Sequence, residues 1–369
     1  MTGLFCFRCG PKSVAFGDLC PDCGLPLSFT KTGALEGKGP GIWRFSSFLP
    51  EARPLSLGEG NTPLIPSLRL GEELGVDLWF KLEGANPTGS FKDRGAAVMV
   101  AVLREKGGKA LADDSSGNAG ASLAAYCARA GIPSLIFVPA YASGPKVNQI
   151  KAYGARLVPV SGPRQAATQA LLETISKDPQ IHYASHNHSP YFLAGLRTLA
   201  YELFLDLSEK SPDHLVVPLG GGGLFLGLFY GFSELLALQK LSKMPKIHIV
   251  QPEACAPIVK AFLSGKAEPD EVVPSETVAE GTRIPKPARG AEVLWALGRC
   301  QGKALTVSEE EIIQAQGELA QKEGVYVEPT SALALAGLKR LASAGEIKEG
   351  ERVVLPLTGS GLKAGGGRC

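Results

Sequence analysis

Short apolar runs alternate with longer segments of helical pattern over most of this chain, starting near residue 57. The runs are continuously apolar, which is typical of parallel strands that are covered on both faces of a sheet. This alternation predicts an α/β fold with doubly wound parallel sheets, in which ligands bind at the carboxyl ends of the strands. The expected strands are LWFKL (78–82), SLIFVP (134–139), RLVPV (156–160), HLVVPL (214–219), KIHIVQ (246–251) and RVVLPL (352–357), and helical spacing is clear over 95–106, 122–130 and 309–323.

Charge and hydropathy argue against several classes of protein. The 369 residues carry a net charge of +2 and no long basic run, so binding of nucleic acid by bulk electrostatics is not expected. The apolar stretch Leu215–Leu238 contains Pro218, four successive glycines and Glu234, which favours a buried strand, a loop and a helix over a membrane span. The N-terminus lacks the apolar core of a signal peptide, and we expect a cytoplasmic protein without a membrane partner.

Four of the eight cysteines form two CxxC pairs near the N-terminus, each followed by a glycine. Two thiolates in a tight turn can hold one ion, and two such turns about ten residues apart are typical of a zinc ribbon. Redox use of one pair and a set of unliganded thiols are the alternatives. Because four thiolates leave no open position on the metal, this Zn²⁺ would be structural rather than catalytic. The predicted ligands are Cys6, Cys9, Cys20 and Cys23.

A single lysine, Lys92, lies between a glycine-containing turn and the start of a predicted helix, in the stretch EGANPTGSFKDRG. A lysine in such a setting can act as a nucleophile toward a carbonyl group. The alternative is a solvated helix start formed by Lys92, Asp93 and Arg94. Asp93 would suit the first turn of a helix, but the two cations would oppose the helix dipole, which argues against that alternative.

Four successive glycines, Gly220, Gly221, Gly222 and Gly223, lie between an expected strand and a helix. Such a loop presents backbone N–H groups to an anion, and the following helix adds the positive end of its dipole. The loop is neither a Walker A sequence nor a dinucleotide-binding GxGxxG. Close packing of strand on helix is the alternative, but it would explain one glycine rather than four. A phosphate-binding loop together with a nucleophilic lysine suggests pyridoxal phosphate as cofactor.

Several longer motifs occur in one order along the chain: GEGNTPL, NPTGSFKDRG, SSGNAG, SPYFLAGLRTLAYEL, EPTSA and LTGSGLK. In these motifs the chain resembles fold-type II pyridoxal-phosphate enzymes, and most closely the threonine synthase family. The resemblance covers nearly all of the chain after residue 50 and extends to the zinc-ribbon start of some branches. It implies a ribbon module over 1–30, a large cofactor-binding α/β domain over 31–96 and 196–369, and a small mobile α/β domain over 97–195. It also implies a homodimer.

The resemblance assigns roles to individual residues. Lys92 would bind the cofactor covalently and carry protons. Asn118 would hydrogen-bond the 3′-oxygen of the cofactor, the glycines 220–223 would hold its phosphate, and Thr358 would face the pyridine nitrogen. A hydroxyl at that position need not protonate the ring, which suits elimination and replacement reactions. Ser115 and Ser116 match the loop that binds the substrate carboxylate, and capping of the next helix is the alternative for either serine.

The sequence departs from the family where the phosphate of O-phosphohomoserine is recognised. Ala119 and Phe192 occupy positions at which the family typically has a threonine and an arginine, so strong charge-assisted contacts would be missing. Arg197 matches a position one helical turn further on and is expected to be a surface charge. Three hypotheses follow for a small amino-acid substrate: a threonine synthase-type reaction, a threonine or serine dehydratase or related β-eliminating lyase, and a non-enzymatic binding protein.

Three histidines lie close together in the stretch HYASHNHSP. Ordinary surface histidines and a metal site are two interpretations, although no cysteine or carboxylate accompanies them. A third is that the stretch lines the substrate site in place of the missing arginine. We therefore predict that His186 or Asn187 contacts the substrate.

Overall fold

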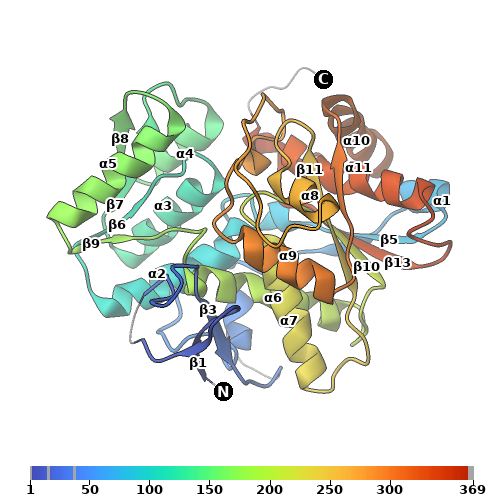
Figure 1. Ribbon diagram of the computed structural model, residues 1–369, viewed down its shortest axis with the longest axis horizontal. Coiled ribbons are helices and arrows are strands. Elements are labelled where there is room, and N and C mark those ends of the chain that lie inside the picture. The colour runs from blue at the N-terminus through green and yellow to red at the C-terminus, as the bar shows by residue number, and fades with distance from the viewer. Residues whose placement is uncertain (1, 15–16, 36–38, 365–369) are drawn as a thin grey trace. The chain divides into compact units, whose positions relative to one another are not determined.

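The computed structural model describes residues 2–14, 17–35 and 39–364 (Figure 1). The chain forms two compact units. The first unit comprises Met1–Gly60 and Asn86–Leu196, and the second comprises Asn61–Ala85 and Arg197–Cys369. These boundaries differ from the expected domains, because residues 31–60 and 86–96 group with 97–195.

Packing inside the first unit explains this grouping. The helix that begins at Lys92 packs on the helix that begins at Asn118. Gly95 lies so close to the ring of Phe192 that a Cβ on Gly95 would be 2.6 Å from the ring atoms. The hydroxyl of Tyr126 donates a hydrogen bond to Glu59 at 2.7 Å. The segments on either side of residues 61–85 are therefore joined by buried contacts.

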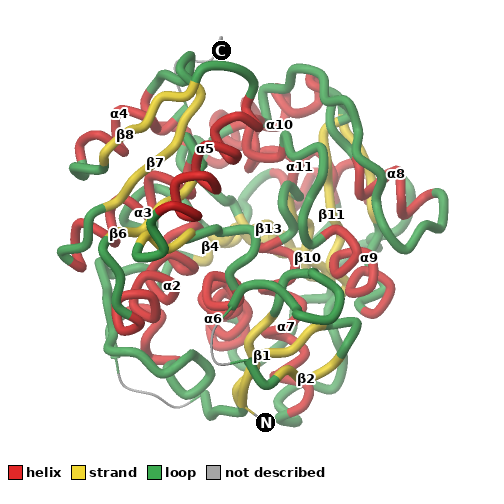
Figure 2. The backbone as a smooth tube through the Cα atoms, turned by 60° about the vertical axis from the view of Figure 1, so that its left-hand side comes forward, coloured by secondary structure: helices red, strands yellow, loops and turns green. Residues whose placement is uncertain are grey.

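A four-stranded parallel sheet forms the centre of the first unit, with the strand order β8-β7-β6-β9. Helices α3 and α5 pack against its strands, and Figure 2 shows β6, β7 and β8 side by side. The elements are α2 (Lys92–Lys106), β6 (Ala110–Asp113), α3 (Asn118–Ala130), β7 (Ser134–Pro139), α4 (Pro145–Ala152), β8 (Arg156–Val160), α5 (Arg164–Lys177) and β9 (Ile181–Tyr183).

A separate three-stranded antiparallel sheet precedes these elements, with the order β2-β1-β3. Leu4 pairs with Phe29 in this sheet, and both side chains are buried together with Leu27. The strands are β1 (Thr2–Cys6), β2 (Gly10–Lys12) and β3 (Ser28–Lys31), and a short 3₁₀ helix, η1 (Gly41–Phe45), follows.

The second unit is built on a six-stranded sheet with the order β12-β11-β10-β13-β5-β4. All neighbouring strands are parallel except β4, which pairs antiparallel with β5 at one edge. Helix α11 packs against β10, β11, β12 and β13 and against α10. The strands are β4 (Leu64–Pro66), β5 (Asp77–Lys81), β10 (His214–Pro218), β11 (Lys246–Pro252), β12 (Ala304–Val307) and β13 (Arg352–Pro356).

Helices and short 3₁₀ turns complete the chain. Helix α6 crosses the boundary between the two units, which falls after Leu196. The elements are α1 (Leu70–Leu74), η2 (Glu83–Ala85), α6 (Pro190–Asp206), α7 (Gly223–Ala237), α8 (Pro257–Leu263), η3 (Glu280–Thr282), α9 (Gly290–Arg299), α10 (Glu309–Glu323), α11 (Pro329–Ser343) and η4 (Gly361–Lys363).

The expected α/β architecture is confirmed, and each of the six predicted apolar runs forms a strand. The apolar stretch Leu215–Leu238 forms β10, a loop and α7, as expected. Within the described residues, no helix combines the length and apolar character needed to span a membrane.

Each of the two larger sheets contains a point at which the direction of strand addition reverses. In the first unit this point lies between β6 and β9, and in the second it lies between β10 and β13. The loops after these strands diverge there, and open α/β sheets bind ligands at the carboxyl ends of such strands. Most of the predicted site residues follow these strands, whereas Lys92 follows β5 and begins α2.

Candidate active site

Lys92 is the first residue of α2 and follows the turn formed by residues 86–90. Its Nζ lies 4.6 Å from the ring centroid of Phe91 and 5.7 Å from that of Phe192. Asp93 and Arg94, the next two residues, are completely buried. The alternative of a solvated helix start is therefore wrong for these two charges.

Asp93 ties the lysine turn to the neighbouring helix. Its carboxylate accepts hydrogen bonds from the backbone N–H and the hydroxyl of Thr88, both at 2.6 Å, and from the hydroxyl of Ser122 at 2.5 Å. Three donors to one buried carboxylate compensate for the cost of removing its charge from water. The turn before Lys92 is thus held in one conformation. Asp93 lies in the FKDRG motif, but this role depends on contacts with Thr88 and Ser122 that the motif alone does not predict.

Ser115 and Ser116 follow β6, and Asn118 is the first residue of α3. Gly117 is the N-cap residue of this helix, so neither serine occupies the cap position. The hydroxyl of Ser115 instead accepts a hydrogen bond from the Gly117 N–H at 3.3 Å. A Cβ on Gly120 would lie 1.9 Å from the carbonyl oxygen of Ser115, so this loop can pack on the helix only if residue 120 is glycine.

His186 and Asn187 lie in the loop after β9, the strand that pairs with β6. The imidazole of His186 is 15% exposed, so the interpretation as a surface histidine is wrong for it. Its Nδ1 lies 3.8 Å from a carboxylate oxygen of Asp113, and its ring lies edge-on to that of Phe192 with 6.0 Å between the centroids. The structure therefore brings the histidine loop and the serine loop together at the ends of β6 and β9.

The four glycines connect β10 to α7 in the second unit, as expected. Gly222 has a φ of +93° and is the N-cap residue of α7. A Cβ on Gly222 would lie 2.5 Å from Val293, and one on Gly220 would lie 2.7 Å from the carbonyl oxygen of Gly281. Close packing thus accounts for two of the glycines. The loop also begins a 15-residue helix, whose first N–H groups and dipole favour an anion.

Thr358 lies in the loop after β13, the strand next to β10, and is buried. Its hydroxyl lies 2.8 Å from that of Ser331, which also accepts a hydrogen bond from the Gly359 N–H at 2.9 Å. Ser331 belongs to the first turn of α11 and holds the Thr358 loop in place. Ser331 lies in the EPTSA motif, which does not by itself predict this contact with Thr358.

The predicted site residues divide between the two units. Six of them belong to the first unit: Lys92, Ser115, Ser116, Asn118, His186 and Asn187. The glycine loop and Thr358 belong to the second unit, where they follow the neighbouring parallel strands β10 and β13.

Arg197 was expected to be a surface charge, and this expectation is wrong. Its side chain is 2% exposed and donates a hydrogen bond to Glu234 at 2.6 Å. The guanidinium also lies over the ring of Tyr230, 4.7 Å from the centroid. Arg197 is therefore part of the packed interior of the second unit.

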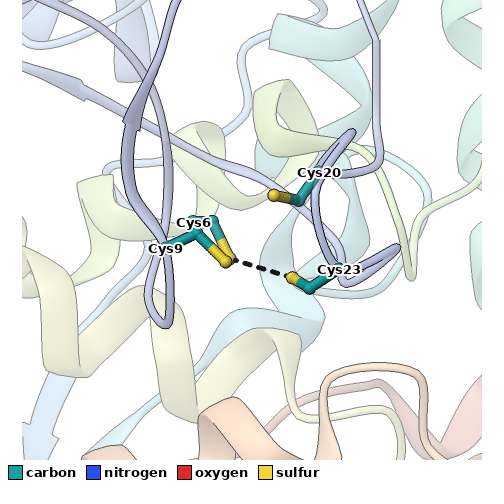
Figure 3. A group of neighbouring side chains, drawn as sticks. All are labelled: Cys6, Cys9, Cys20 and Cys23. Atoms are coloured by element: carbon teal, nitrogen blue, oxygen red, sulfur yellow. Dashed lines mark hydrogen bonds between the residues drawn. The ribbon is translucent and has the colours of Figure 1, made fainter.

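The four cysteines of the CxxC pairs converge in the first unit (Figure 3). All four sulfur atoms lie within 4.8 Å of one another, and those of Cys6 and Cys23 are 3.6 Å apart. Sulfur atoms bound to one tetrahedral Zn²⁺ lie roughly 3.8 Å apart, as follows from the Zn–S bond length. The cluster therefore fits the size of a four-thiolate zinc site.

Comparison with known proteins connects this geometry to a family. The family described as "Pyridoxal-phosphate dependent enzyme" matches residues 55–359. The chain therefore belongs to the pyridoxal-phosphate-dependent enzyme family.

Within this family, relatives that are similar over most of their length are threonine synthases, which confirms the resemblance found in the sequence motifs. The chain is 39% identical to a threonine synthase of Methanosarcina acetivorans over 333 residues, which cover 89% of this chain and 82% of that one. It is 40% identical to a threonine synthase of Bacillus sp. (strain ULM1) over 325 residues, covering 87% and 89% of the two chains. Among solved structures, maize serine racemase has the same fold, with a TM-score of 0.73 and 23% identity over 81% of this chain and 88% of that one.

Proposed function

We propose that this protein is a threonine synthase, a lyase that converts O-phosphohomoserine and water to threonine and inorganic phosphate with pyridoxal phosphate as cofactor. The observation that carries the proposal is the similarity to threonine synthases, at 39–40% identity over most of both chains. The setting of Lys92, at the start of α2 after a turn held by a buried aspartate, supports it.

The residues present fit the cofactor. In the first unit, Lys92 would hold it covalently and Asn118 would bind its 3′-oxygen. In the second unit, the N–H groups at Gly220–Gly223 would bind its phosphate at the start of α7, and Thr358 would face the ring nitrogen. When bound, pyridoxal phosphate supplies an electron sink that stabilises negative charge at the substrate Cα. Because Thr358 is neutral and is fixed by Ser331, the ring nitrogen would face a hydroxyl rather than a carboxylate.

The substrate-facing roles follow from the chemistry of the side chains. The Lys92 amine would remove a proton from the substrate and return it at a later step. The hydroxyls of Ser115 and Ser116, with nearby backbone N–H groups, would bind the substrate carboxylate. His186 or Asn187, in the loop after the neighbouring strand, would contact the far end of the substrate.

A dehydratase or related β-eliminating lyase is the second candidate, and specific observations favour it. Phe192 is 2% exposed and Ala119 is 5% exposed, so neither offers a polar group to a phosphate. The deciding measurement uses purified protein with added cofactor. Release of inorganic phosphate from O-phosphohomoserine supports the first proposal, whereas ammonia and a keto acid from serine or threonine support the second.

We also propose that Cys6, Cys9, Cys20 and Cys23 bind one structural Zn²⁺. Two of the four thiols, those of Cys6 and Cys20, are buried, and the antiparallel strands β1 and β2 bring Cys6 and Cys9 to the same turn. A closed four-thiolate site would connect two turns of a module with a small core. Metal analysis of the purified protein tests this proposal. The expected homodimer and cytoplasmic location stay predictions, and light scattering of the purified protein tests the first.

A further inference from the structure

Asp113 is the last residue of β6 and lies where the substrate loops of the first unit meet. Its side chain is 1% exposed. In the part of the chain that the structure describes, neither carboxylate oxygen has a hydrogen-bond partner. Burial raises the pKa of Asp113 above its ordinary value. A carboxylate buried in this way is costly unless a positive charge compensates for it.

The neighbouring acid, Asp114, has a different environment. Its carboxylate lies 3.1 Å from the guanidinium of Arg164 and accepts hydrogen bonds from the hydroxyls of Thr168 and Tyr183. Burial would raise the pKa of Asp114, but Arg164 and these donors lower it below its ordinary value. Two consecutive carboxylates thus have opposite surroundings, an arrangement that often separates a structural acid from a functional one.

His186 is the group that faces Asp113. Its Nδ1 lies 3.8 Å from the carboxylate, and this nitrogen too has no hydrogen-bond partner within the described residues. A small rotation of either side chain would form the missing hydrogen bond. The carboxylate would then fix a proton on Nδ1 and stabilise an imidazolium, and Nε2 would be left to bind a ligand.

The other groups around His186 differ in charge. Asp114, the residue after β6, adds a second negative charge nearby. The ring of Phe192, on α6, is edge-on to the imidazole, and the Nζ of Lys92 lies 5.7 Å from that ring. The phenyl ring therefore has an imidazole at one contact and the amine of Lys92 at another. This chain of contacts connects Asp113 to the reactive amine within one unit.

We propose that Asp113 is a positioning residue that holds His186 as an imidazolium, whose Nε2–H binds the phosphate monoester of the substrate. This inference rests on the proposed function and identifies the substrate class as amino acids with a phosphate ester on the side chain. The histidine would supply the positive charge that Phe192 does not provide. A charge-assisted hydrogen bond to phosphate from a buried, oriented donor accounts for recognition without an arginine.

The kinetic experiment compares two variants with two matched controls. Asp113→Asn keeps the shape of the side chain and removes its charge, and His186→Gln removes the cation. The controls are His182→Gln, whose ring bonds the Gly107 carbonyl, and Asp178→Asn, whose carboxylate pairs with Lys109. We expect the first two variants to raise the KM for O-phosphohomoserine and the inhibition constant of inorganic phosphate by about 10- to 100-fold. The value of kcat should change much less, and both controls should match wild type.

The double variant measures whether the two residues act as a unit. If Asp113 acts through His186, adding Asp113→Asn to His186→Gln should raise KM little beyond the effect of His186→Gln alone. If KM and phosphate inhibition are unchanged in Asp113→Asn while His186→Gln impairs both, the inference is overturned.

A spectroscopic measurement does not depend on turnover. In ¹⁵N-histidine-labelled protein carrying its cofactor, we expect the ring nitrogens of His186 to shift on addition of inorganic phosphate, with a proton on both nitrogens in the phosphate complex. A neutral His186 in the phosphate complex of wild-type protein, or no response to phosphate, would overturn the inference even if Asp113→Asn does not fold. If wild type binds phosphate at His186 but releases none from O-phosphohomoserine, the proposed function fails and the phosphate site stands.

Discussion

Acidification should destabilise the second unit through two buried histidines, which lie near the N-terminal ends of two neighbouring strands of its sheet. His214 and His248 belong to the neighbouring strands β10 and β11, and each side chain is 1% exposed. Their rings stack with 5.2 Å between centroids. The N–H of Lys303 donates to Nδ1 of His248, so the proton of that ring must be on Nε2. Nε2 then donates to Nδ1 of His214 at 2.9 Å, and Nε2 of His214 donates to Glu351 at 2.9 Å.

Every ring nitrogen of the two histidines therefore has a hydrogen-bond partner when both imidazoles are neutral. An added proton on Nδ1 of His248 would face the N–H of Lys303, and one on Nδ1 of His214 would face the Nε2–H of His248. Either proton would place two donors opposite each other. Burial, with repulsion from His214, Lys246 and Lys303, lowers the pKa of His248 to about 3. Burial also lowers the pKa of His214, although Glu351 opposes this shift.

The sign and size of the effect follow from proton linkage. A histidine in the unfolded chain takes up a proton below about pH 6.5, whereas His248 in the folded protein does not. The unfolded state thus binds more protons, and stability falls as the pH is lowered. Acidification from about pH 7.5 to about pH 5 should lower the free energy of unfolding by about 2 kcal/mol through His248 alone. The contribution of Glu351, whose pKa is lowered by the Lys348 N–H and by His214, is lost only at lower pH.

The assay is urea unfolding of wild type and His248→Gln across this pH range. Glutamine keeps one donor and one acceptor but does not titrate, so the variant should lose about 2 kcal/mol less than wild type on acidification. His182→Gln removes a histidine outside the network and should retain the wild-type pH dependence. If His248→Gln and wild type lose the same stability, the linkage argument is wrong.

Three further changes test other parts of the molecule. Lys92→Ala should remove the visible absorbance of the bound cofactor and lower kcat by about 10³-fold or more, because it deletes both the covalent link and the proton carrier. Cys20→Ser should reduce bound zinc from about one ion per chain to a small fraction and lower the melting temperature, as measured by metal analysis and calorimetry. Gly95→Ala would place a Cβ 2.6 Å from the ring of Phe192, and we expect a loss of about 1–3 kcal/mol in urea unfolding. A fully active, wild-type-stable Gly95→Ala protein would contradict the packing described for α2.

The strands that are easiest to predict from the sequence are buried ones, because burial on both faces requires a run of apolar residues. The runs at 134–139 and 214–219 form β7 and β10, since mostly β-branched and large apolar residues suit a strand covered on both faces. The run at 156–160 coincides with β8, although none of the residues of this edge strand is buried. The strands β6, β9 and β12 were not predicted. Their sequences, ALAD, IHY and ALTV, are short or rich in alanine, and their conformation depends on pairing with neighbouring strands.

The same distinction applies to the candidate site. Lys92 and the glycine loop could be located because local geometry restricts them, the lysine to a helix start and Gly222 to a positive φ. Asp113 and Ser331 could not, because each is defined by a partner that is distant in sequence: His186 for Asp113 and Thr358 for Ser331. Two consecutive acids after an expected helix and before SSGNAG were the available signal for Asp113.

A substrate site must hold the reactive amine in place and must bind the substrate, and different residues of the first unit would perform these two tasks. Groups held by backbone and short hydrogen bonds, such as the Lys92 turn tied down by Asp93, determine where the reactive amine lies. Groups held only by long side-chain contacts, such as His186 beside Asp113, can be exchanged without moving that amine. Substrate preference in this protein should accordingly respond to substitutions at Asp113 and His186 while cofactor binding does not.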